Sequence, residues 1–325
     1  MASSSSSRTA AHQPALAVFA AISAAWVFVL VVLGAFTTTI GAGMVFSDWP
    51  LSNGSINPHG WLTDISMFAE HSHRLSAGVM STLTIVLAIW LWRTEERAWL
   101  RRLAIFGVGL VLTQALVGGL RVLLGNFQVE MVDTCVGRLF AMLHAVLAQL
   151  FACTLIAIAA ACSRSWIERP KPVACDVRAF GSLCCLLLFV QLGIAAVMRH
   201  SFAGLAIPSF PASNFDGGLL PHVWNFRVAI HFAHRVMAAV LCVVLPWFAI
   251  KLSGDANATG TMRLGAILLV LLLATQIFLG AQIIWTFRGV YVTTGHVLVG
   301  ALTLATTFWL TWQAHRDVIE EKTAP

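Results

Sequence analysis

Eight long apolar segments limit what this chain can fold into more than any other feature of its sequence. A helix needs about 20 apolar residues to cross a hydrocarbon core of roughly 30 Å, and each segment is long enough. Because backbone groups in lipid must bond to one another, segments of this length predict transmembrane helices. The first is too long for the apolar core of a signal peptide, so we expect it to be retained. The segments are 16–36, 67–92, 103–120, 139–163, 179–198, 228–250, 264–287 and 290–314.

The charged residues are few and lie mainly between these segments. Of 325 residues, 58% are hydrophobic and 10% charged, which excludes a soluble globular domain, a disordered chain and a disulfide-rich secreted scaffold. Thirteen Lys and Arg residues lie on the side of the termini and five near the other side, so the positive-inside rule predicts cytoplasmic termini. This topology accounts for the net charge of +6 without a nucleic-acid partner. The thirteen are Arg8, Arg93, Arg97, Arg101, Arg102, Arg164, Arg169, Lys171, Arg178, Lys251, Arg263, Arg316 and Lys322; the five are Arg121, Arg138, Arg199, Arg227 and Arg288.

The sequence contains an internal repeat. A shift of 161 positions lays 42–53 over 203–214, with an aromatic residue before proline in both, and carries His73-Arg74 onto His234-Arg235. Gln114 and Gly118 match Gln276 and Gly280 after one further residue, and His144 matches His296 after a shorter connection. Four spans map onto four spans in the same direction, which indicates a parallel duplication.

The predicted fold is therefore an all-α integral membrane protein with eight transmembrane helices in two tandem, pseudo-symmetric four-helix bundles. We expect the bundles to comprise 16–163 and 179–314, joined by a cytoplasmic linker at 164–178. Short cytoplasmic tails, 1–15 and 315–325, complete the chain.

Histidines inside the spans are candidate ligands, because ionisable groups in a membrane are costly. His73 and His144 form a pair in the first half, and His234 and His296 form its copy in the second. All four lie at similar depth, near the outer face, an arrangement that would hold a haem iron between facing helices. A packing role is the alternative for a single histidine. Zinc or copper is less favoured, because neither bundle offers Cys or a third His at that level. Five other histidines are expected to be solvated in loops or tails: His12, His59, His200, His222 and His315.

Charged side chains accompany the histidines. Glu70 lies three residues before His73, on the same helical face, and is a candidate proton-handling catalytic group. The second half has His231 at the matching position, which indicates that the two sites have diverged. Arg74 and Arg235 are candidate partners of haem propionates, with snorkelling to the interface as the alternative. Glu70 could instead simply pair with Arg74 or reach the outer interface.

These motifs together resemble the heme A synthase family, the bacterial and mitochondrial enzymes that oxidise the C8 methyl of haem o to the formyl group of haem A. Their order, spacing and duplication carry the resemblance, which covers essentially the whole chain. The resembling elements are Gly41-Ala42-Gly43, Ser47-Asp48-Trp49-Pro50, Glu70 with His73-Arg74, Gln114 with Gly118-Gly119, Leu143-His144, His234-Arg235, Gln276 with Gly280, and His296.

The resemblance implies roles for these residues. His73 and His144 would ligate the iron of the substrate haem, with Glu70 as the catalytic carboxylate. His234 and His296 would be the axial ligands of a haem b. The implied location is the bacterial plasma membrane. The implied partners are a haem o synthase that supplies substrate, cytochrome oxidase assembly factors and an unidentified electron donor.

The chain departs from the family in one respect. Many bacterial members have a cysteine pair in the first outer loop, and this sequence has no cysteine between Thr37 and Ser66. This loop therefore has no cysteine that could deliver electrons or haem. The departure from the family also leaves open whether the substrate is haem o or a different haem. The seven cysteines predict no structural disulfide.

Two other functions are compatible with the same residues. A di-haem cytochrome b would only pass electrons, and a transporter built from parallel repeats would use the histidines to relay protons. The sequence leaves open the electron donor, the oxygen source, the route of haem entry and whether the chain forms a homo-oligomer.

Overall fold

The computed structural model describes residues 12–129, 134–168 and 172–323. Three cations from the charge count, Arg8, Arg169 and Lys171, lie outside the described residues. Eight of the helices in the described part are long and apolar enough to cross a membrane, which confirms the eight predicted spans. They are α1 (Pro14–Thr39), α2 (Ile65–Thr94), α3 (Ala98–Leu123), α4 (Val136–Cys162), α6 (Cys175–His200), α7 (Phe226–Gly254), α8 (Gly260–Trp285) and α9 (Val290–Ala314).

The shorter elements lie in the connections. The expected linker contains the short helix α5 (Arg164–Ile167) and the first turn of α6, and the expected C-terminal tail contains α10 (Arg316–Thr323). Strands β1 (Gln128–Val129) and β2 (Thr134–Cys135) pair antiparallel before α4.

Polar caps explain why several helices extend beyond the apolar segments. The Asp64 side chain accepts hydrogen bonds from the backbone of Ser66 and Met67, so α2 begins before its apolar run. Asn225 caps α7 in the same way through the backbone N–H of Val228. Ser163 caps α5 through the N–H of Trp166, which gives the linker a helical turn that apolar patterning could not indicate.

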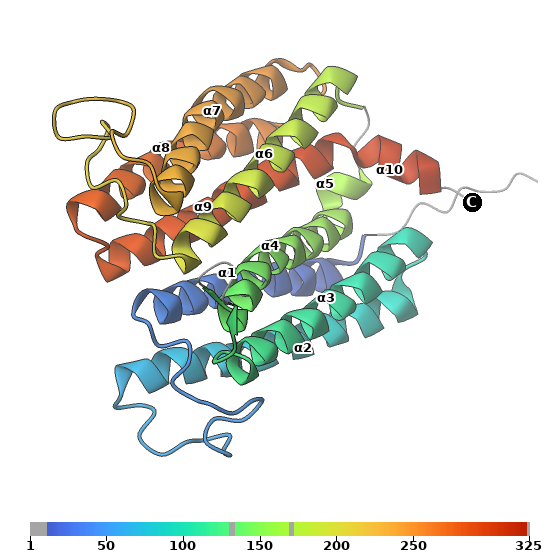
Figure 1. Ribbon diagram of the computed structural model, residues 1–325. Coiled ribbons are helices and arrows are strands. Elements are labelled where there is room, and N and C mark those ends of the chain that lie inside the picture. The colour runs from blue at the N-terminus through green and yellow to red at the C-terminus, as the bar shows by residue number, and fades with distance from the viewer. Residues whose placement is uncertain (1–11, 130–133, 169–171, 324–325) are drawn as a thin grey trace, which may run out of the picture.

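The helices form two four-helix units that lie side by side (Figure 1). Within the first unit α1 packs on α2 and α4, and α3 packs on both α2 and α4. The second unit repeats these contacts with α6 to α9. Between the units α1 packs on α9 and α4 packs on α6, and α4 also contacts α9. These paired contacts have the two-fold pseudo-symmetry that a parallel duplication predicts.

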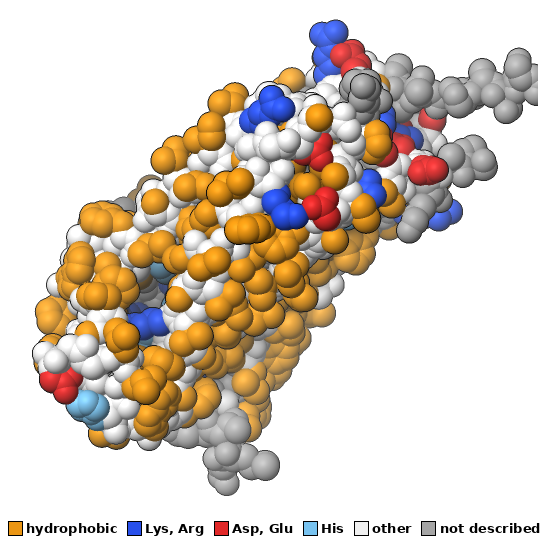
Figure 2. All heavy atoms as spheres, turned by 90° about the horizontal axis from the view of Figure 1, so that it is seen from above, with side chains coloured by type: hydrophobic (Ala, Val, Ile, Leu, Met, Phe, Trp, Pro, Cys, Tyr) orange, Lys and Arg blue, Asp and Glu red, His pale blue; other side chains and the backbone are white. Residues whose placement is uncertain are grey.

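The two ends of the molecule differ. We call the end with the long connections 40–64 and 201–225 the loop end, and the end with α10 and the α2–α3 connection the terminal end (Figure 1). Apolar side chains cover the long side of the molecule in Figure 2, and charged side chains gather mostly near one end. This distribution is expected of a surface that faces lipid along its length.

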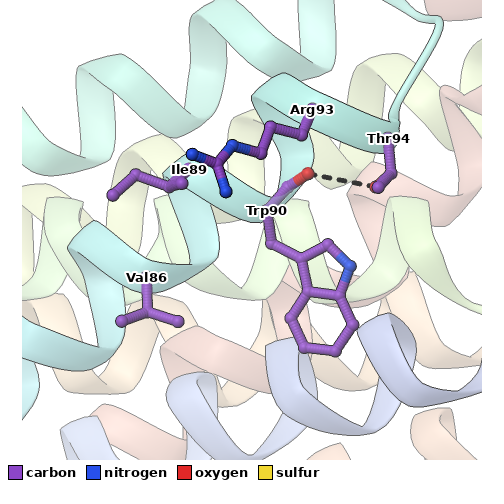
Figure 3. A pocket seen from close by; sticks show the side chains of 5 residues that line it. All are labelled: Val86, Ile89, Trp90, Arg93 and Thr94. Carbon is purple, nitrogen blue, oxygen red and sulfur yellow. Dashed lines mark hydrogen bonds between the residues drawn. The ribbon is translucent and has the colours of Figure 1, made fainter.

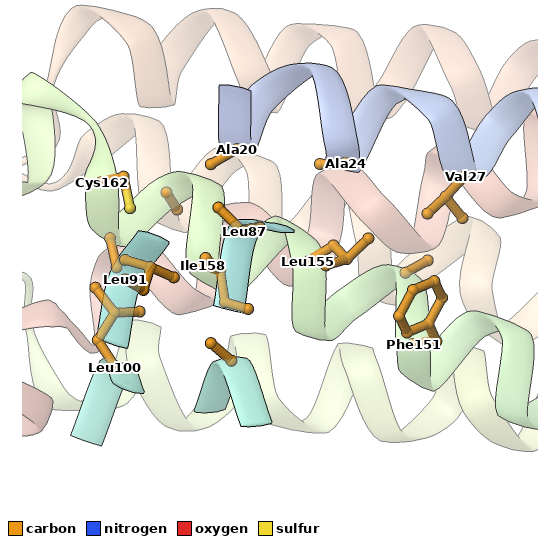
Figure 4. Close-up of a cluster of buried hydrophobic side chains, with 14 of the residues drawn as sticks. Ala20, Ala24, Val27, Leu87, Leu91, Leu100, Phe151, Leu155, Ile158 and Cys162 are labelled. Atoms are coloured by element: carbon orange, nitrogen blue, oxygen red, sulfur yellow. The ribbon is translucent and has the colours of Figure 1, made fainter. Parts of the chain in front are cut away.

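Each unit has its buried apolar core in the terminal half. Leu91 at the end of α2, Leu100 at the start of α3 and Ile158 near the end of α4 are fully buried together (Figure 4). Leu245 on α7 and Leu310 on α9 are equivalent members of the second core. The four paired histidines belong to neither core and lie in the loop half of the bundles.

Candidate functional site

The second bundle brings its two histidines face to face. His234 on α7 and His296 on α9 have ring centroids 6.5 Å apart. Metal–imidazole bonds are about 2 Å long, so two rings on one metal atom have centres roughly 6 Å apart. Gln276 on α8 contacts His296 at both ring nitrogens, through its carbonyl at 3.1 Å and its side-chain amide at 3.3 Å. Gln191 on α6 donates to the His234 carbonyl at 3.1 Å.

The first bundle has the equivalent pair. His73 on α2 and His144 on α4 lie within electrostatic reach of each other. Gln114 on α3 donates to the His144 carbonyl at 3.1 Å. The repeat had matched Gln114 to Gln276, and both side chains contact the histidine of the next helix.

Glycines let these rings lie close to a neighbouring helix. A Cβ on Gly34 would be 3.1 Å from His73 Cε1, and one on Gly118 would be 3.2 Å from His144 Cε1. At Gly280 the corresponding distance to His296 Cε1 is 3.3 Å. A Cβ at these positions would require the ring to move by a few tenths of an ångström, so the glycines help to determine the positions of the imidazoles.

The residues present fit a planar metal macrocycle. Buried ring nitrogens of His73, His144 and His234 lack a hydrogen-bond partner in the described part of the chain. Unpartnered buried polar atoms are costly, so a ligand that bonds to them would remove a penalty. Among the described residues no three His, Cys, Asp or Glu side chains are grouped as a metal-ion site, which disfavours zinc or copper.

Glu70 lies beside the first pair and is held by three donors. Its Oε2 accepts from the backbone N–H of Val45 at 2.7 Å and of Phe46 at 3.2 Å, while Oε1 accepts from the Arg74 guanidinium. The residue is only 4% exposed. Arg74 also donates to the carbonyls of three loop residues, Phe46, Asp48 and Leu51. The Glu70–Arg74 pair therefore fastens the 40–64 loop over the first bundle.

The second bundle repeats this fastening with a different chemical group. His231 replaces Glu70, and its Nδ1 accepts from the backbone N–H of Ile207 at 3.2 Å. The Arg235 guanidinium lies beside His231, with its Nε 3.3 Å from His231 Nε2, and donates to the carbonyls of Ile207, Ser209 and Ala212. These three carbonyls are the repeat equivalents of those that Arg74 binds. Only the first site has a carboxylate there.

The 40–64 loop packs against the loop end of α3. The Trp49 ring lies on Gly119, where a Cβ would come within 2.5 Å of it, and the Arg121 guanidinium lies equally close to Gly43. In the second bundle Phe210 makes an edge contact with Trp285, at a centroid distance of 6.2 Å. The Trp49-Pro50 and Phe210-Pro211 bonds are both cis. Each bundle thus has a covering loop of the same design.

The structure brings together most of the residues that the sequence singled out. The four histidines form two pairs, with Glu70 one turn from His73. The guanidiniums of Arg74 and Arg235 are engaged by loop carbonyls, so their role with haem propionates stays an untested prediction. The expectation that His200 is a solvated loop residue is wrong. It is the last residue of α6, half-buried and within electrostatic reach of His144, because the helix continues beyond the apolar segment.

Three residues near the sites were missed by sequence reasoning. Gln191 and Gly34 have Leu30 and Ala195 at their repeat positions, so the duplication could not reveal them. Arg121 counted only as an outer cation. Its spacing of three from Gly118 was a usable signal, because residues three apart share a helix face.

Two hollows on the surface of the described part lie away from the histidine pairs. One is lined by Val86, Ile89, Trp90, Arg93 and Thr94, near the terminal end of α2 (Figure 3). A second adjoins it between the start of α1 and Trp90. Neither contains a histidine of the two pairs, and both belong to the lipid-facing side of α1 and α2.

Comparison with known proteins shows the family of the chain. The model of the family described as cytochrome oxidase assembly protein (COX15-CtaA) matches residues 17–308, a range that includes all four paired histidines. The chain belongs to this family.

Similar members of the family are heme A synthases from three bacteria. The protein of Halalkalibacterium halodurans is 26% identical over 305 residues, covering 90% of this chain and 94% of its own length. That of Alkalihalophilus pseudofirmus is 24% identical, covering 91% and 96%. That of Geobacillus kaustophilus is 27% identical, covering 85% and 84%. The likeness therefore extends over both bundles.

Proposed function

We propose that this chain is a heme A synthase, a membrane oxidoreductase that acts in heme A biosynthesis for cytochrome oxidase. Its reaction would convert haem o to haem A by successive hydroxylation of the C8 methyl group to a formyl group. The observation that carries the proposal is the duplicated histidine pair: His73, His144 and His234 keep an unpartnered buried ring nitrogen, and the rings of His73, His144 and His296 pack against glycine. The family match supports the biosynthetic role.

The two bundles would have different tasks. His73 and His144 would hold the substrate haem, and His234 and His296 a haem b, through their imidazole nitrogens. The bound macrocycles supply the redox chemistry, as cofactors generally do. The chain supplies ligands, orientation and the loops that exclude water.

Glu70 would handle protons in the first site. Among the residues that the structure describes, it is the carboxylate within electrostatic reach of Arg121, and it lies on the same face of α2 as His73. To accept or deliver a proton its carboxylate must exchange one of its hydrogen bonds, to Arg74 or to the loop backbone. The matching residue of the second bundle is His231, so only the first bundle has a carboxylate at this position. This difference supports an assignment of the chemistry to the first bundle only.

We further propose the bacterial plasma membrane as the location, with both termini in the cytoplasm. The excess of Lys and Arg on the side of the termini supports this orientation. A haem o synthase would supply the substrate laterally, and assembly factors of cytochrome oxidase would receive the product. The electron donor is a further partner.

Extraction and mass analysis of haems tests the proposal. Cells that make haem o but no haem A should form haem A when they express this chain. Glu70→Ala should lower the yield about 100-fold or more and leave haem b bound, since a positioned proton-transfer group contributes that much. Glu70→Gln keeps an acceptor for the loop N–H and should be equally inactive. Exposed Glu96 is the control, and Glu96→Ala should behave as wild type.

Two outcomes would contradict parts of the proposal. Unaltered haem A formation by both Glu70 variants would remove the catalytic assignment. A wild-type protein that retains two haems with unchanged side groups would be the electron-transfer cytochrome, a function that the equivalent histidine pairs of the two bundles also favour.

A further inference from the structure

Arg121 on α3 lies between the first histidine pair and the loop that covers it. Gly118 lies against His144, with its Cβ position 3.2 Å from the ring. Residues three apart share one face of a helix, so Arg121 lies on the His144 side of α3, about one turn nearer the loop end. The covering loop meets it there, because a Cβ on Gly43 would be 2.5 Å from Arg121 Nη2.

The Arg121 guanidinium has no hydrogen bond or ion pair among the described residues. It lies within electrostatic reach of His73, His144 and Glu70. Glu70 is already bonded to Arg74 and to the loop backbone. A half-buried guanidinium beside the first histidine pair is thus left with open donors.

Among the described residues, positive charge is in excess around Arg121. Arg199 lies within its reach and donates to the Ala35 carbonyl and the Thr39 hydroxyl of α1, which are neutral acceptors. Arg288 lies within reach of Arg199. Like charges at partly buried positions repel one another, so an anion bound here would relieve that repulsion.

We propose that Arg121 binds a carboxylate side chain of the macrocycle held by His73 and His144. The inference rests on the proposed function of the first bundle. A haem has carboxylates along one edge, and the apolar core fills the terminal half of the first bundle, so these carboxylates would face the loop end, where Arg121 lies. Guanidinium binds carboxylate through two parallel hydrogen bonds, which would also fix the orientation of the ring plane.

The repeat makes Arg121 specific to the first bundle. The equivalent position on α8 is Ile283, one turn beyond Gly280 and its contact with His296. The second bundle therefore has no arginine at this position of α8; Arg199, which lies within electrostatic reach of His296, comes from α6 and is bonded to α1. Arg121 is thus a positioning residue of the first bundle. It would orient the substrate haem there, whereas the haem of the second bundle would need only its axial ligands.

The test is a titration of the haem-free full-length protein in detergent. The probes are iron protoporphyrin IX, with two carboxylates, and its dimethyl ester, with none. The readout is the haem absorbance, and the phase that His73→Ala removes is assigned to the first bundle. Arg121→Gln should weaken dicarboxylate binding in this phase about tenfold or more, the size of one charge-assisted hydrogen bond. Its affinity for the ester should equal that of wild type.

Matched variants separate this role from folding. Exposed Arg227 also lies at the loop end, and Arg227→Gln should bind both probes as wild type does. Arg121→Lys keeps the charge and should fall between wild type and Arg121→Gln for the dicarboxylate. The phase that depends on His234 should be unchanged in all three and serves as the control for folding.

The outcomes are distinguishable. If Arg121→Gln binds the dicarboxylate as wild type does, or loses both probes equally, the carboxylate contact is overturned while the histidine site stands. If His73→Ala removes no phase, the proposed haem site of the first bundle is wrong, and the Arg121 inference falls with it.

Discussion

At the scale of single residues, glycines determine how closely the histidine rings can approach a neighbouring helix. His144 can approach α3 only because position 118 carries no Cβ, and His73 depends on position 34 in the same way. The two bundles also differ in one residue at matching positions, Glu70 in the first and His231 in the second. Both side chains accept a loop N–H, but only the carboxylate adds a negative charge beside a histidine pair.

Gly118→Ala tests the close approach. The added methyl group would meet His144 Cε1 at 3.2 Å, so the ring must move by a few tenths of an ångström. We expect lower haem occupancy of the first bundle and unchanged occupancy of the second, measured as haem per protein. Gly109→Ala on the same helix meets nothing within 4 Å and should retain full occupancy, with a gain in stability of about 0.4–1 kcal/mol. Equal occupancy in the two variants would refute the packing argument.

At the scale of elements, the covering loops are held by side chains that bond to their backbone. Arg74 and Arg235 donate hydrogen bonds to loop carbonyls at equivalent positions, those of Phe46 and Ile207 among them. Within the first loop, Asp48 accepts the N–H of Asn53 at 2.8 Å and of Gly54 at 2.7 Å, where both residues have positive φ. This turn gives the tip of the loop a defined shape.

Acid should loosen the tip of this loop. The backbone N–H of Gly54, with that of Asn53, lowers the pKa of Asp48 below its ordinary value of 3.8. A lowered pKa means stabilisation that is complete above the ordinary value and is lost as the pH falls below it. Hydrogen exchange at Asn53 and Gly54, corrected for the intrinsic rate, should therefore quicken below about pH 3.8. Asp48→Asn should exchange faster at neutral pH and lose most of this pH dependence; a wild-type-like profile would contradict the role of the carboxylate.

At the scale of the whole molecule, the linker and α10 are held on the first bundle by a polar cluster at the terminal end. Arg97, in the α2–α3 connection, donates to Glu95, to Glu320 of α10 and to the Ala161 carbonyl. The fully buried Trp166 donates to Glu320 at 2.7 Å. Burial raises the pKa of Glu95, but the hydrogen bonds and charge of Arg97 outweigh it, and the net pKa is lowered. The linker and the C-terminal helix thus close the packed half of the first bundle.

Removing Arg97 should destabilise the protein as a whole. Arg97→Ala leaves the buried Glu95 without its partner, and breaking a buried pair costs about 3–5 kcal/mol. The exposed Arg164–Glu168 pair offers a control, and Arg164→Ala should cost about 0–1 kcal/mol. Thermal unfolding in detergent, with α10 monitored by its proteolysis, compares the two. Similar losses for both variants would mean that the cluster does not hold the terminal end together.

Much of this architecture was readable in advance because lipid imposes a simple rule. Spans of apolar residues must be helices, and a repeat that matches His73 to His234 also matches the bundles that hold them. Connections escaped prediction for the opposite reason. Single polar caps such as Ser163 start a helix in the linker, and one hydrogen bond leaves no periodic pattern.

By itself, the sequence determined the membrane class, the eight spans, the duplication and the four paired histidines, since these follow from hydropathy and from matching positions. Only the tertiary structure decided what each polar group bonds to. It assigned Arg74 and Arg235 to loop carbonyls and left Arg121, beside His144, without a hydrogen-bond partner in the part of the chain that the structure describes. Hydropathy measures the preference of a residue for lipid, whereas the partner of a guanidinium depends on which distant backbone atoms the fold brings within about 3 Å.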